Sequence, residues 1–311
     1  MDAKPETFSS NGTILLTGEY LVLFGARVLA FPVRYGQKMT IREQNINSIL
    51  AWRAYEPNGL WFNVDFSLPN LSIIDTCSME KAMYLQKVLL QLEKLTPGFF
   101  NRPSGLAIDT LADFPVQWGM GTRSTLITNL ASWAGIDALA LHHAVSKGSG
   151  YDVACATACT PVVYQLPSSG KPLVASITFN KLFTGNMYLV YSGRKNSTEQ
   201  QIIQFLQRHR GMKSEIKRIS KITDKIIEET SLEKFIDLLM EHERVIGAVL
   251  DEPPVQFKNF VSFKGVVKSL GPWESDFVLA VTTESPGYVY KYFEQFGLTT
   301  VLLFKNTVYT G

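Results

Sequence analysis

The stretch FPVQWGMGTRSTLITNLASWAG, Phe114 to Gly135, joins a glycine-rich turn to an apolar helical pattern. Gly119 and Gly121 lie in the turn, and the spacing of apolar residues predicts a helix from about Ser124 to Ala134. Glycines let a backbone approach a ligand closely, and the amide groups and dipole of a helix N-terminus attract anions. The stretch therefore predicts a phosphate-binding turn, although simple helix capping produces the same pattern.

The turn differs from two common phosphate-binding motifs. No Gly-Lys-Ser/Thr follows it, as a P-loop requires, and the third glycine of a dinucleotide-binding fingerprint is missing. The hydroxyl groups of Thr122 and Ser124 could donate hydrogen bonds or help to ligate Mg²⁺. Arg123 between them is unexpected in either motif. On these residues alone, phosphate binding and capping remain alternatives.

The composition is that of a globular protein. Of its residues, 46% are hydrophobic and 19% are charged. A length of 311 residues is more than one hydrophobic core usually organises, so two domains are expected. Thirty Lys and Arg nearly balance 28 Asp and Glu, and a net charge of +2 gives no electrostatic basis for binding nucleic acid or an anionic membrane. Neither a bilayer-spanning apolar run of ~20 residues nor a secretory signal is evident, so a cytoplasmic location is expected.

Apolar periodicity predicts strands mixed with helices, which favours an α+β protein. The predicted strands are Gln37–Gln44, Leu60–Leu68, Ser104–Phe114, Ser176–Phe179, Asn186–Gly193, Phe277–Thr283 and Thr299–Phe304. The predicted helices, besides the one after the turn, are Ser78–Leu95, Thr198–Arg210, Ser220–Thr230, Leu232–Leu250, a helix that begins at Tyr151 and Asp152, and one with Ser285 as N-cap and Pro286 at its first position. The segment PSSGKP, Pro167–Pro172, has the composition of a linker.

Several segments, in the same order, resemble the GHMP small-molecule kinases. They are Asn11–Ala26 (NGTILLTGEYLVLFGA), Pro115–Thr125 (PVQWGMGTRST), Gly148–Ala156 (GSGYDVACA), Lys195–Ile202 (KNSTEQQI) and Ser269–Ala280 (SLGPWESDFVLA). The resemblance spans nearly the whole chain. It is strongest to the bacterial branch named for Gly-Tyr-Asp-Ile-Ala, with Val153 in the isoleucine position, and this branch is similar to mevalonate and phosphomevalonate kinases.

The resemblance implies a two-domain GHMP-kinase fold of the α+β class. An α/β domain that binds ATP would occupy residues 1–168, and a ferredoxin-like α+β domain would occupy residues 169–311, with the active site between them. It also implies phosphorylation, with ATP and Mg²⁺, of a hydroxyl group on a small hydroxy acid, with mevalonate or phosphomevalonate as the leading candidate.

The resemblance also assigns roles to individual residues. The loop that would wrap the ATP phosphates consists of Trp118, Gly119, Met120, Gly121, Thr122, Arg123 and Ser124. Asp152 would act on the acceptor hydroxyl as a base or an orienting carboxylate, because phosphoryl transfer to an alcohol needs such a group. Ser149 and Gly150 would shape the approach to it. Glu19 would lie near the acceptor or the metal ion, and Thr122 keeps one of the hydroxyl groups that help to hold Mg²⁺.

Two departures from the family pattern concern the phosphate site. The lysine that usually follows Asn-Gly is Thr13, and the two serine positions of the usual Gly-Leu-Gly-Ser-Ser hold Thr122 and Arg123. A guanidinium group suits phosphate oxygens, so Arg123 could replace the lost lysine charge and act as a catalytic residue.

Two further departures concern the metal and the C-terminal loop. The segment Leu139–Lys147 has no carboxylate where mevalonate kinases place a metal-binding glutamate. The loop Gly271–Asp276 reads GPWESD instead of GAWGGD, so Glu274 adds a negative charge and Ser275 replaces a glycine. These changes favour a second hypothesis, a catalytically impaired protein of this fold that binds a ligand or a partner.

The expected partner is a small molecule, not nucleic acid or a membrane, and the protein is expected to be a monomer or a homodimer. A nucleic-acid-binding module is disfavoured because the sequence has no basic or aromatic stripe. His242, in MEHERVIG, could face the cleft between the domains, but it is expected to be a packing residue.

Overall fold

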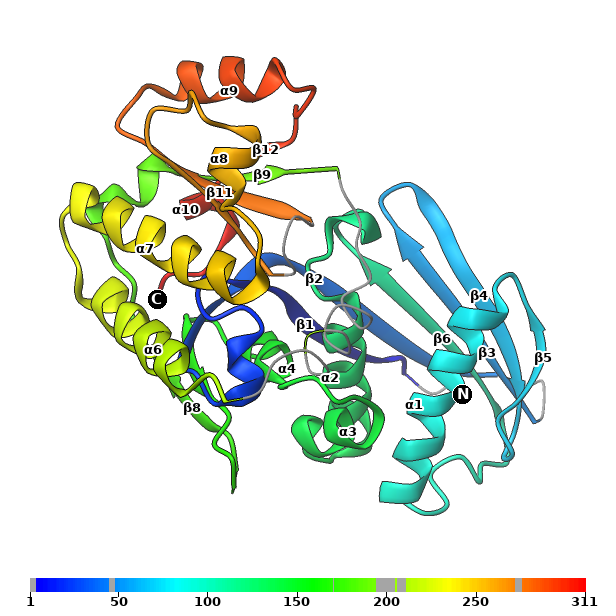
Figure 1. Ribbon diagram of the computed structural model, residues 1–311. Coiled ribbons are helices and arrows are strands. Elements are labelled where there is room, and N and C mark those ends of the chain that lie inside the picture. The colour runs from blue at the N-terminus through cyan, green and yellow to red at the C-terminus, as the bar shows by residue number, and fades with distance from the viewer. Residues whose placement is uncertain (1–3, 45–47, 170, 194–204, 206–210, 272–275) are drawn as a thin grey trace. The chain divides into compact units, whose positions relative to one another are not determined.

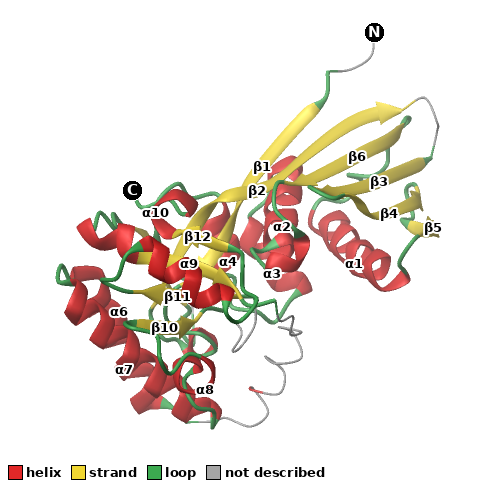
Figure 2. Cartoon of the chain, turned by 90° about the horizontal axis from the view of Figure 1, so that it is seen from above, coloured by secondary structure: helices red, strands yellow, loops and turns green. Residues whose placement is uncertain are grey.

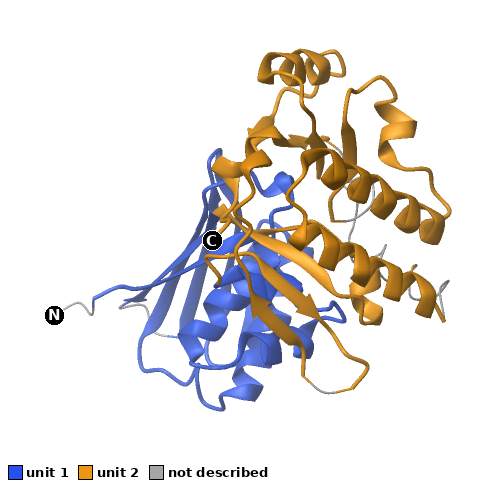
Figure 3. Cartoon of the chain, turned by 90° about the vertical axis from the view of Figure 1, so that its left-hand side faces the viewer, with its two compact units in different colours: residues 1–12, 35–157 blue, residues 13–34, 158–311 orange. Residues whose placement is uncertain are grey.

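The computed structural model describes residues 4–44, 48–169, 171–193, 205, 211–271 and 276–311. These residues form two compact units, shown in different colours in Figure 3. Unit 1 consists of residues 1–12 and 35–157, and unit 2 of residues 13–34 and 158–311. The predicted boundary at residues 168/169 differs from this division, which assigns residues 13–34 and 158–168 to unit 2.

Two strands contribute residues to both units. They are β1, Glu6–Leu15, and the long β2, Val28–Gln44, which pairs with β1. In unit 1 the C-terminal part of β2 pairs antiparallel with β6, Gly105–Ala112. The strand order then continues through three further strands, β3 (Ile49–Glu56), β4 (Gly59–Ser67) and β5 (Ser72–Thr76). Only the β3 and β6 pairing is parallel among these.

The unit 1 sheet is covered by helices on one face (Figure 2). Alternate residues of β3 and β4 are buried, as the period of a strand requires, and they pack with the apolar stripe of α1, Met79–Leu95. The remaining helical elements of unit 1 are η2 (Val116–Trp118), α2 (Thr122–Ala134), α3 (Ala138–Val145) and α4 (Tyr151–Ala156). Both α3 and α4 pack against α2, so the glycine-rich turn is attached to a buried helix.

Unit 2 is built around an antiparallel sheet with the order β10-β11-β9-β12 (Figure 1). These strands are β9 (Met187–Tyr191), β10 (Val266–Ser269), β11 (Phe277–Val281) and β12 (Val301–Leu303). A hairpin of β7 (Val162–Gln165) and β8 (Leu173–Ser176) pairs with the first residues of β2.

Unit 2 also contains several helical elements. They are η1 (Leu21–Phe24), η3 (Leu182–Asn186), α6 (Lys213–Glu228), α7 (Leu232–Leu250), α8 (Val255–Asn259), α9 (Pro286–Glu294) and α10 (Phe304–Thr307). Helices α7 and α8 contact β10, and α6 packs against α7. The buried aromatic side chains of α9 join the core beside β9 and β11.

Most of the predicted elements are confirmed. The helix Leu232–Leu250 has the predicted bounds, and Ser285 caps α9 by accepting a hydrogen bond from the Tyr288 N–H. The helix after the glycine-rich turn begins at Thr122 and α6 begins at Lys213, both earlier than predicted. The helix predicted over residues 198–210 falls almost wholly outside the described residues.

The strand predicted over Ser176–Phe179 is wrong. The strand β8 ends at Ser176, where that prediction begins, and all four of its residues are exposed. Its position is fixed by antiparallel pairing with β7, from Gln165 with Leu173 to Val162 with Ser176, and not by burial of alternate side chains. Among the described residues, no helix is long and apolar enough to cross a membrane.

Candidate active site

The glycine-rich turn ends as the N-terminus of α2. Gly119 and Gly121 have φ angles of 66° and 94°, in the left-handed region that glycine tolerates, and Gly121 is the N-cap. Because the first amide groups of a helix have no intrahelical acceptor and Gly121 has no side chain to accept from them, this turn suits an anion. The turn therefore has left-handed glycines directly before a helix N-terminus, and its binding of phosphate stays a prediction.

Two hydroxyl groups after the turn point back into the helix. Ser124 is 1% exposed and donates a hydrogen bond of 2.9 Å to the Gly121 carbonyl oxygen, and Thr125 donates one of 3.1 Å to the same oxygen. Thr122, at the first position of α2, is partly exposed. Of the two hydroxyl residues that the sequence suggested for the phosphate site, Ser124 thus serves the turn itself, and Thr122 is the one nearer to solvent.

Buried polar side chains attach α2 to the strands of unit 1. Asn129 Nδ2 donates to the Gln37 carbonyl oxygen at 3.0 Å, and Ser10 Oγ donates to the Thr125 carbonyl oxygen at 3.0 Å. All four residues are less than 9% exposed. These bonds fix the helix, and with it the turn, relative to β1 and β2, which is the rigidity that a preorganised phosphate site requires.

The side chains on either side of the turn rest on aromatic rings. Trp118 packs edge-on against Tyr35, with 5.6 Å between ring centroids. The guanidinium carbon of Arg123 lies 4.9 Å from the ring centroid of Tyr84 on α1, and the side chain is exposed. The cation that the sequence assigns to the phosphates is therefore at the start of α2, where it has a cation–π contact.

Asp152 belongs to the same unit as the turn. It is the second residue of α4 and is partly exposed, and α4 packs against α2 (Figure 1). Ser149 just before it is 4% exposed, and Gly150 is surrounded by Leu139, His142 and His143 of α3. Unit 1 thus contains the proposed carboxylate, the glycine turn, Ser149 and Gly150 on three mutually packed helices.

Glu19 and Thr13 lie in unit 2. Thr13 is on β1 and is 8% exposed, and Glu19 follows β1 in a turn and is 1% exposed. Lys268 Nζ donates to Glu19 Oε1 at 2.5 Å, so the carboxylate has a buried partner that the sequence did not reveal. The assignment of Glu19 to the acceptor stays a prediction.

A metal ion finds few donors in the described part of the chain. The described residues include no group of three or more His, Cys, Asp or Glu side chains that could hold a metal ion. Mg²⁺ prefers oxygen ligands in octahedral geometry and usually takes one or two protein carboxylates besides substrate phosphates and water. The turn offers amide groups and the Thr122 hydroxyl, which suit phosphate oxygens but do not form a metal site. Glu274, Ser275 and residues 195–198 lie outside the described residues.

The sequence matches no protein-family model and no curated protein. Among solved structures, the chain is similar to mevalonate kinase from Methanococcus jannaschii, with a TM-score of 0.67, 12% identity and 96% of each chain covered. It is similar to Streptococcus pneumoniae phosphomevalonate kinase in complex with phosphomevalonate and AMPPNP, with a TM-score of 0.69, 14% identity and 95% of this chain and 99% of that chain covered. Lactococcus lactis galactokinase complexed with galactose gives a TM-score of 0.62, 11% identity and coverage of 99% and 94%.

These structural neighbours are GHMP-family kinases. The mixed α+β architecture, with a large sheet and a second, antiparallel sheet, is the two-domain GHMP-kinase fold, so the predicted fold class is confirmed. The resemblance to the Gly-Tyr-Asp-Ile-Ala branch stays a prediction, as do the roles of the individual site residues.

Proposed function

We propose that the chain is a GHMP-type kinase that transfers the γ-phosphoryl group of ATP to a hydroxyl group of a small hydroxy acid, with mevalonate or phosphomevalonate as the first candidates. The observation that carries the proposal is the N-terminus of α2, capped by Gly121 in a left-handed conformation within a fold shared with phosphomevalonate kinase. We also retain residues 1–168 and 169–311 as the functional domains.

In this proposal, some residues of unit 1 bind the phosphates and others act on the acceptor hydroxyl. The backbone from Trp118 to Ser124 would bind the phosphate oxygens through its amide groups and the positive end of the α2 dipole. Asp152 would accept the proton of the acceptor hydroxyl while the hydroxyl oxygen bonds to the γ-phosphorus of ATP. Ser149 and Gly150 would orient the acceptor. ATP, when bound, supplies the γ-phosphoryl group, and ADP is the leaving group. No step is assigned to Mg²⁺, for which Thr122 is the candidate ligand.

The alternative function is a ligand-binding or partner-binding module of this fold without catalysis. It is favoured by the exposed Arg123, whose guanidinium group lies over Tyr84. Only the first function predicts phosphoryl transfer.

Titration calorimetry with ATP, in the presence and absence of Mg²⁺, tests the proposal, followed by an ATP-consumption assay with mevalonate, phosphomevalonate and related hydroxy acids. We expect nucleotide binding and turnover of at least one hydroxy acid. No binding at millimolar ATP would exclude the kinase, and binding without turnover would favour the alternative function.

The variant Arg123→Ser is expected to weaken ATP binding by roughly tenfold or more, because a hydrogen bond to a charged group contributes about 1.5–3 kcal/mol. Calorimetry of the variant measures the loss. The control is Tyr84→Leu, which removes the aromatic contact at 4.9 Å but keeps the charge and should change affinity little. Higher turnover in Arg123→Ser would instead mean that the arginine impairs the site.

A further inference from the structure

Four ionisable side chains are buried together in unit 2. They come from a turn, a helix and a strand: Glu19 follows β1, His242 and Glu243 are on α7, and Lys268 is on β10. Their exposed fractions are 1%, 0%, 2% and 0%. Charged groups are rarely buried unless they are paired, because removing them from water is costly. This cluster therefore needs an account of its charges.

Lys268 is the cation of the buried cluster. Its Nζ donates to Glu19 Oε1 at 2.5 Å and to the Ser269 carbonyl oxygen at 2.7 Å, and it lies 3.5 Å from Glu243 Oε1. Glu19 therefore holds the closer ion pair. Glu243 has only the longer contact, and neither of its carboxylate oxygens has a hydrogen-bond partner among the described residues.

His242 is neutral in this cluster. The Gly18 N–H donates to its Nε2 at 2.9 Å, so Nε2 is an acceptor and the ring proton is on Nδ1. Glu19 Oε2 lies 3.3 Å from the same Nε2. Burial, together with the charge of Lys268, keeps the pKa of His242 well below its ordinary value. One ammonium group thus faces two carboxyl groups, and only one carboxylate can be balanced.

The remaining proton belongs to Glu243. Burial raises its pKa from 4.5 to about 7, with Lys268 opposing the shift and Glu19 adding to it. Burial also raises the pKa of Glu19, but the short contact with Lys268 opposes that shift. Below about pH 7 the cluster therefore holds a protonated Glu243 beside the pair of Glu19 and Lys268.

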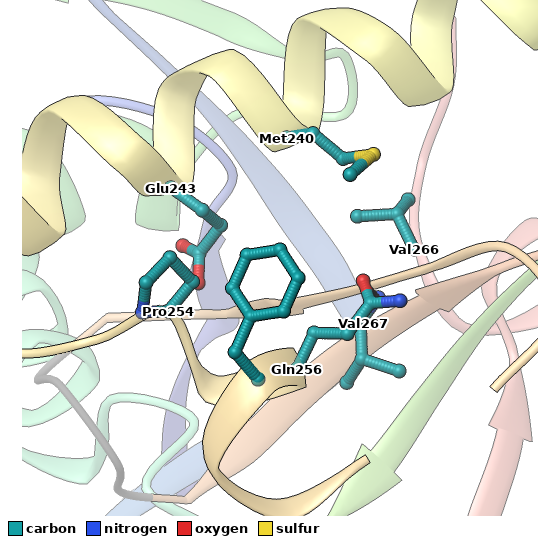
Figure 4. A pocket seen from close by; sticks show the side chains of 7 residues that line it. Met240, Glu243, Pro254, Gln256, Val266 and Val267 are labelled. Atoms are coloured by element: carbon teal, nitrogen blue, oxygen red, sulfur yellow. Dashed lines mark hydrogen bonds between the residues drawn. The ribbon is translucent and has the colours of Figure 1, made fainter. Parts of the chain in front are cut away.

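A small cavity adjoins Glu243 (Figure 4). Its volume is about 10 Å³, roughly that of one water molecule, and it lies between α7, the start of α8 and β10. Its lining residues are Met240, Glu243, Pro254, Gln256, Phe257, Val266 and Val267. Room for one water molecule next to the carboxyl group gives the proton a place to exchange without unfolding of the helix.

The turn that carries Glu19 has a strained backbone. Gly18 has a φ of 84°, and a Cβ there would lie 2.2 Å from Val28 Cγ1, so no other residue fits. Tyr20 has a φ of 59° and a ψ of −43°, a conformation that a residue with a side chain rarely adopts. Such strain persists only where the surroundings fix it. Here the Gly18 amide is bonded to His242, and the Glu19 carboxylate to Lys268.

We propose that Glu19, His242, Glu243 and Lys268 form a proton-binding site that controls the turn Gly18–Tyr20, and that loss of the proton from Glu243 loosens this turn. An ionised Glu243 competes with Glu19 for Lys268, and so weakens the bond that holds the turn against its strain. Lys268, His242 and Glu243 are thus positioning residues for the turn. The site is contained in unit 2, and the proposal does not depend on kinase activity.

The groups that face Glu243 from the packed elements set the expected pH dependence. Lys268 faces it from β10 and Glu19 from the turn, whereas the residues of α8 and the preceding segment that line the cavity are not ionisable. Helix α6 contributes Arg218, but this residue pairs with Glu241 on the exposed side of α7. Lys268 and Glu19 are therefore the charges that tune the Glu243 proton.

The sign of the effect follows from the direction of each pKa shift. Because the pKa of Glu243 is raised in the folded chain, its contribution to stability is fully present below pH 4.5 and is lost as the pH rises through about 7. The lowered pKa of His242 acts oppositely, with stability lost as the pH falls below 6.5. Above pH 6.5, His242 is neutral in both the folded and the unfolded chain, so the change of stability with pH there is due to Glu243.

Hydrogen exchange of the Gly18 amide, corrected for intrinsic exchange, tests the proposal in the unliganded chain. Between pH 6.5 and about 8.5 we expect its protection to fall about fourfold in the wild-type protein, as a pKa shift from 4.5 to about 7 requires. The variant Glu243→Gln, which cannot ionise, should keep its protection across this range. A matched control on the same helix is Glu241→Gln, which should behave like the wild type.

Infrared spectroscopy provides an independent readout of the proton. A protonated carboxyl band that disappears as the pH rises through about 7 is expected in the wild type and in Glu241→Gln, but not in Glu243→Gln. If Glu243→Gln does not fold, Glu19→Gln is the second variant, and it should lower the pKa of that band by removing the neighbouring charge. Protection of Gly18 that is independent of pH in the wild type, or a band that persists in Glu243→Gln, would overturn the proposal.

Discussion

The variant Lys268→Met is expected to lower the free energy of unfolding by about 3–5 kcal/mol, the usual cost of removing one partner from a buried ion pair. Lys268 is the cation that balances Glu19 at 2.5 Å, and its side chain is 0% exposed. Without it the Glu19 carboxylate must either remain charged in an apolar interior or take up a proton. Chemical denaturation at neutral pH, with the midpoint and slope compared to wild type, measures the loss.

A surface lysine provides the control for this substitution. Lys258 pairs with Glu252 at 3.2 Å, but both side chains are more than a third exposed, so Lys258→Met should cost less than about 1 kcal/mol. The double variant Lys268→Met with Glu19→Gln should recover part of the stability, because it no longer leaves a buried charge alone. An unfolding free energy of Lys268→Met within about 1 kcal/mol of wild type would contradict the buried ion pair.

The elements that the sequence predicted well are those whose bounds depend on residues close together in the chain. Apolar residues at helical spacing gave the bounds of α7, and a serine followed by proline gave the start of α9. The two glycines indicated a turn before the helix, and the structure has both of them in the left-handed region. The strand β8 was misplaced because all of its side chains are exposed, so burial leaves no period-two pattern in its sequence.

The buried charge cluster could not be predicted from local patterns. Lys268 and Glu19 are separated by 249 positions, and the strand Val266–Ser269 was not predicted because a lysine interrupts its apolar run. A lysine inside a short apolar segment is itself the signal that was available, since it must find a partner when the strand is buried. The position of the Arg123 side chain could not be predicted either, because it depends on a contact with the Tyr84 ring on α1.

The second large effect is expected for Asp152→Asn, which should lower the turnover of the hydroxy-acid substrate by about 10²–10⁴-fold, the usual contribution of a general base. Asparagine keeps the size and the hydrogen-bonding shape of the side chain but cannot accept a proton. Because the glycine-rich turn and Asp152 are at the starts of different helices of unit 1, ATP affinity should change less than about threefold. Steady-state kinetics and titration calorimetry on the same protein separate the two quantities.

The comparison of turnover with binding distinguishes the two proposed functions. The control Asp109→Asn removes a carboxylate of β6 that pairs with Arg42 at the exposed surface, so it should leave turnover and ATP affinity nearly unchanged. Equal turnover in wild type and Asp152→Asn would refute the assigned role of Asp152. If the wild type binds ATP but turns over none of the hydroxy acids, the phosphate-binding turn has been retained without the chemistry. The positions that depart from the family pattern, among them Thr13, Arg123, Glu274 and Ser275, would then be the candidates for the loss of activity.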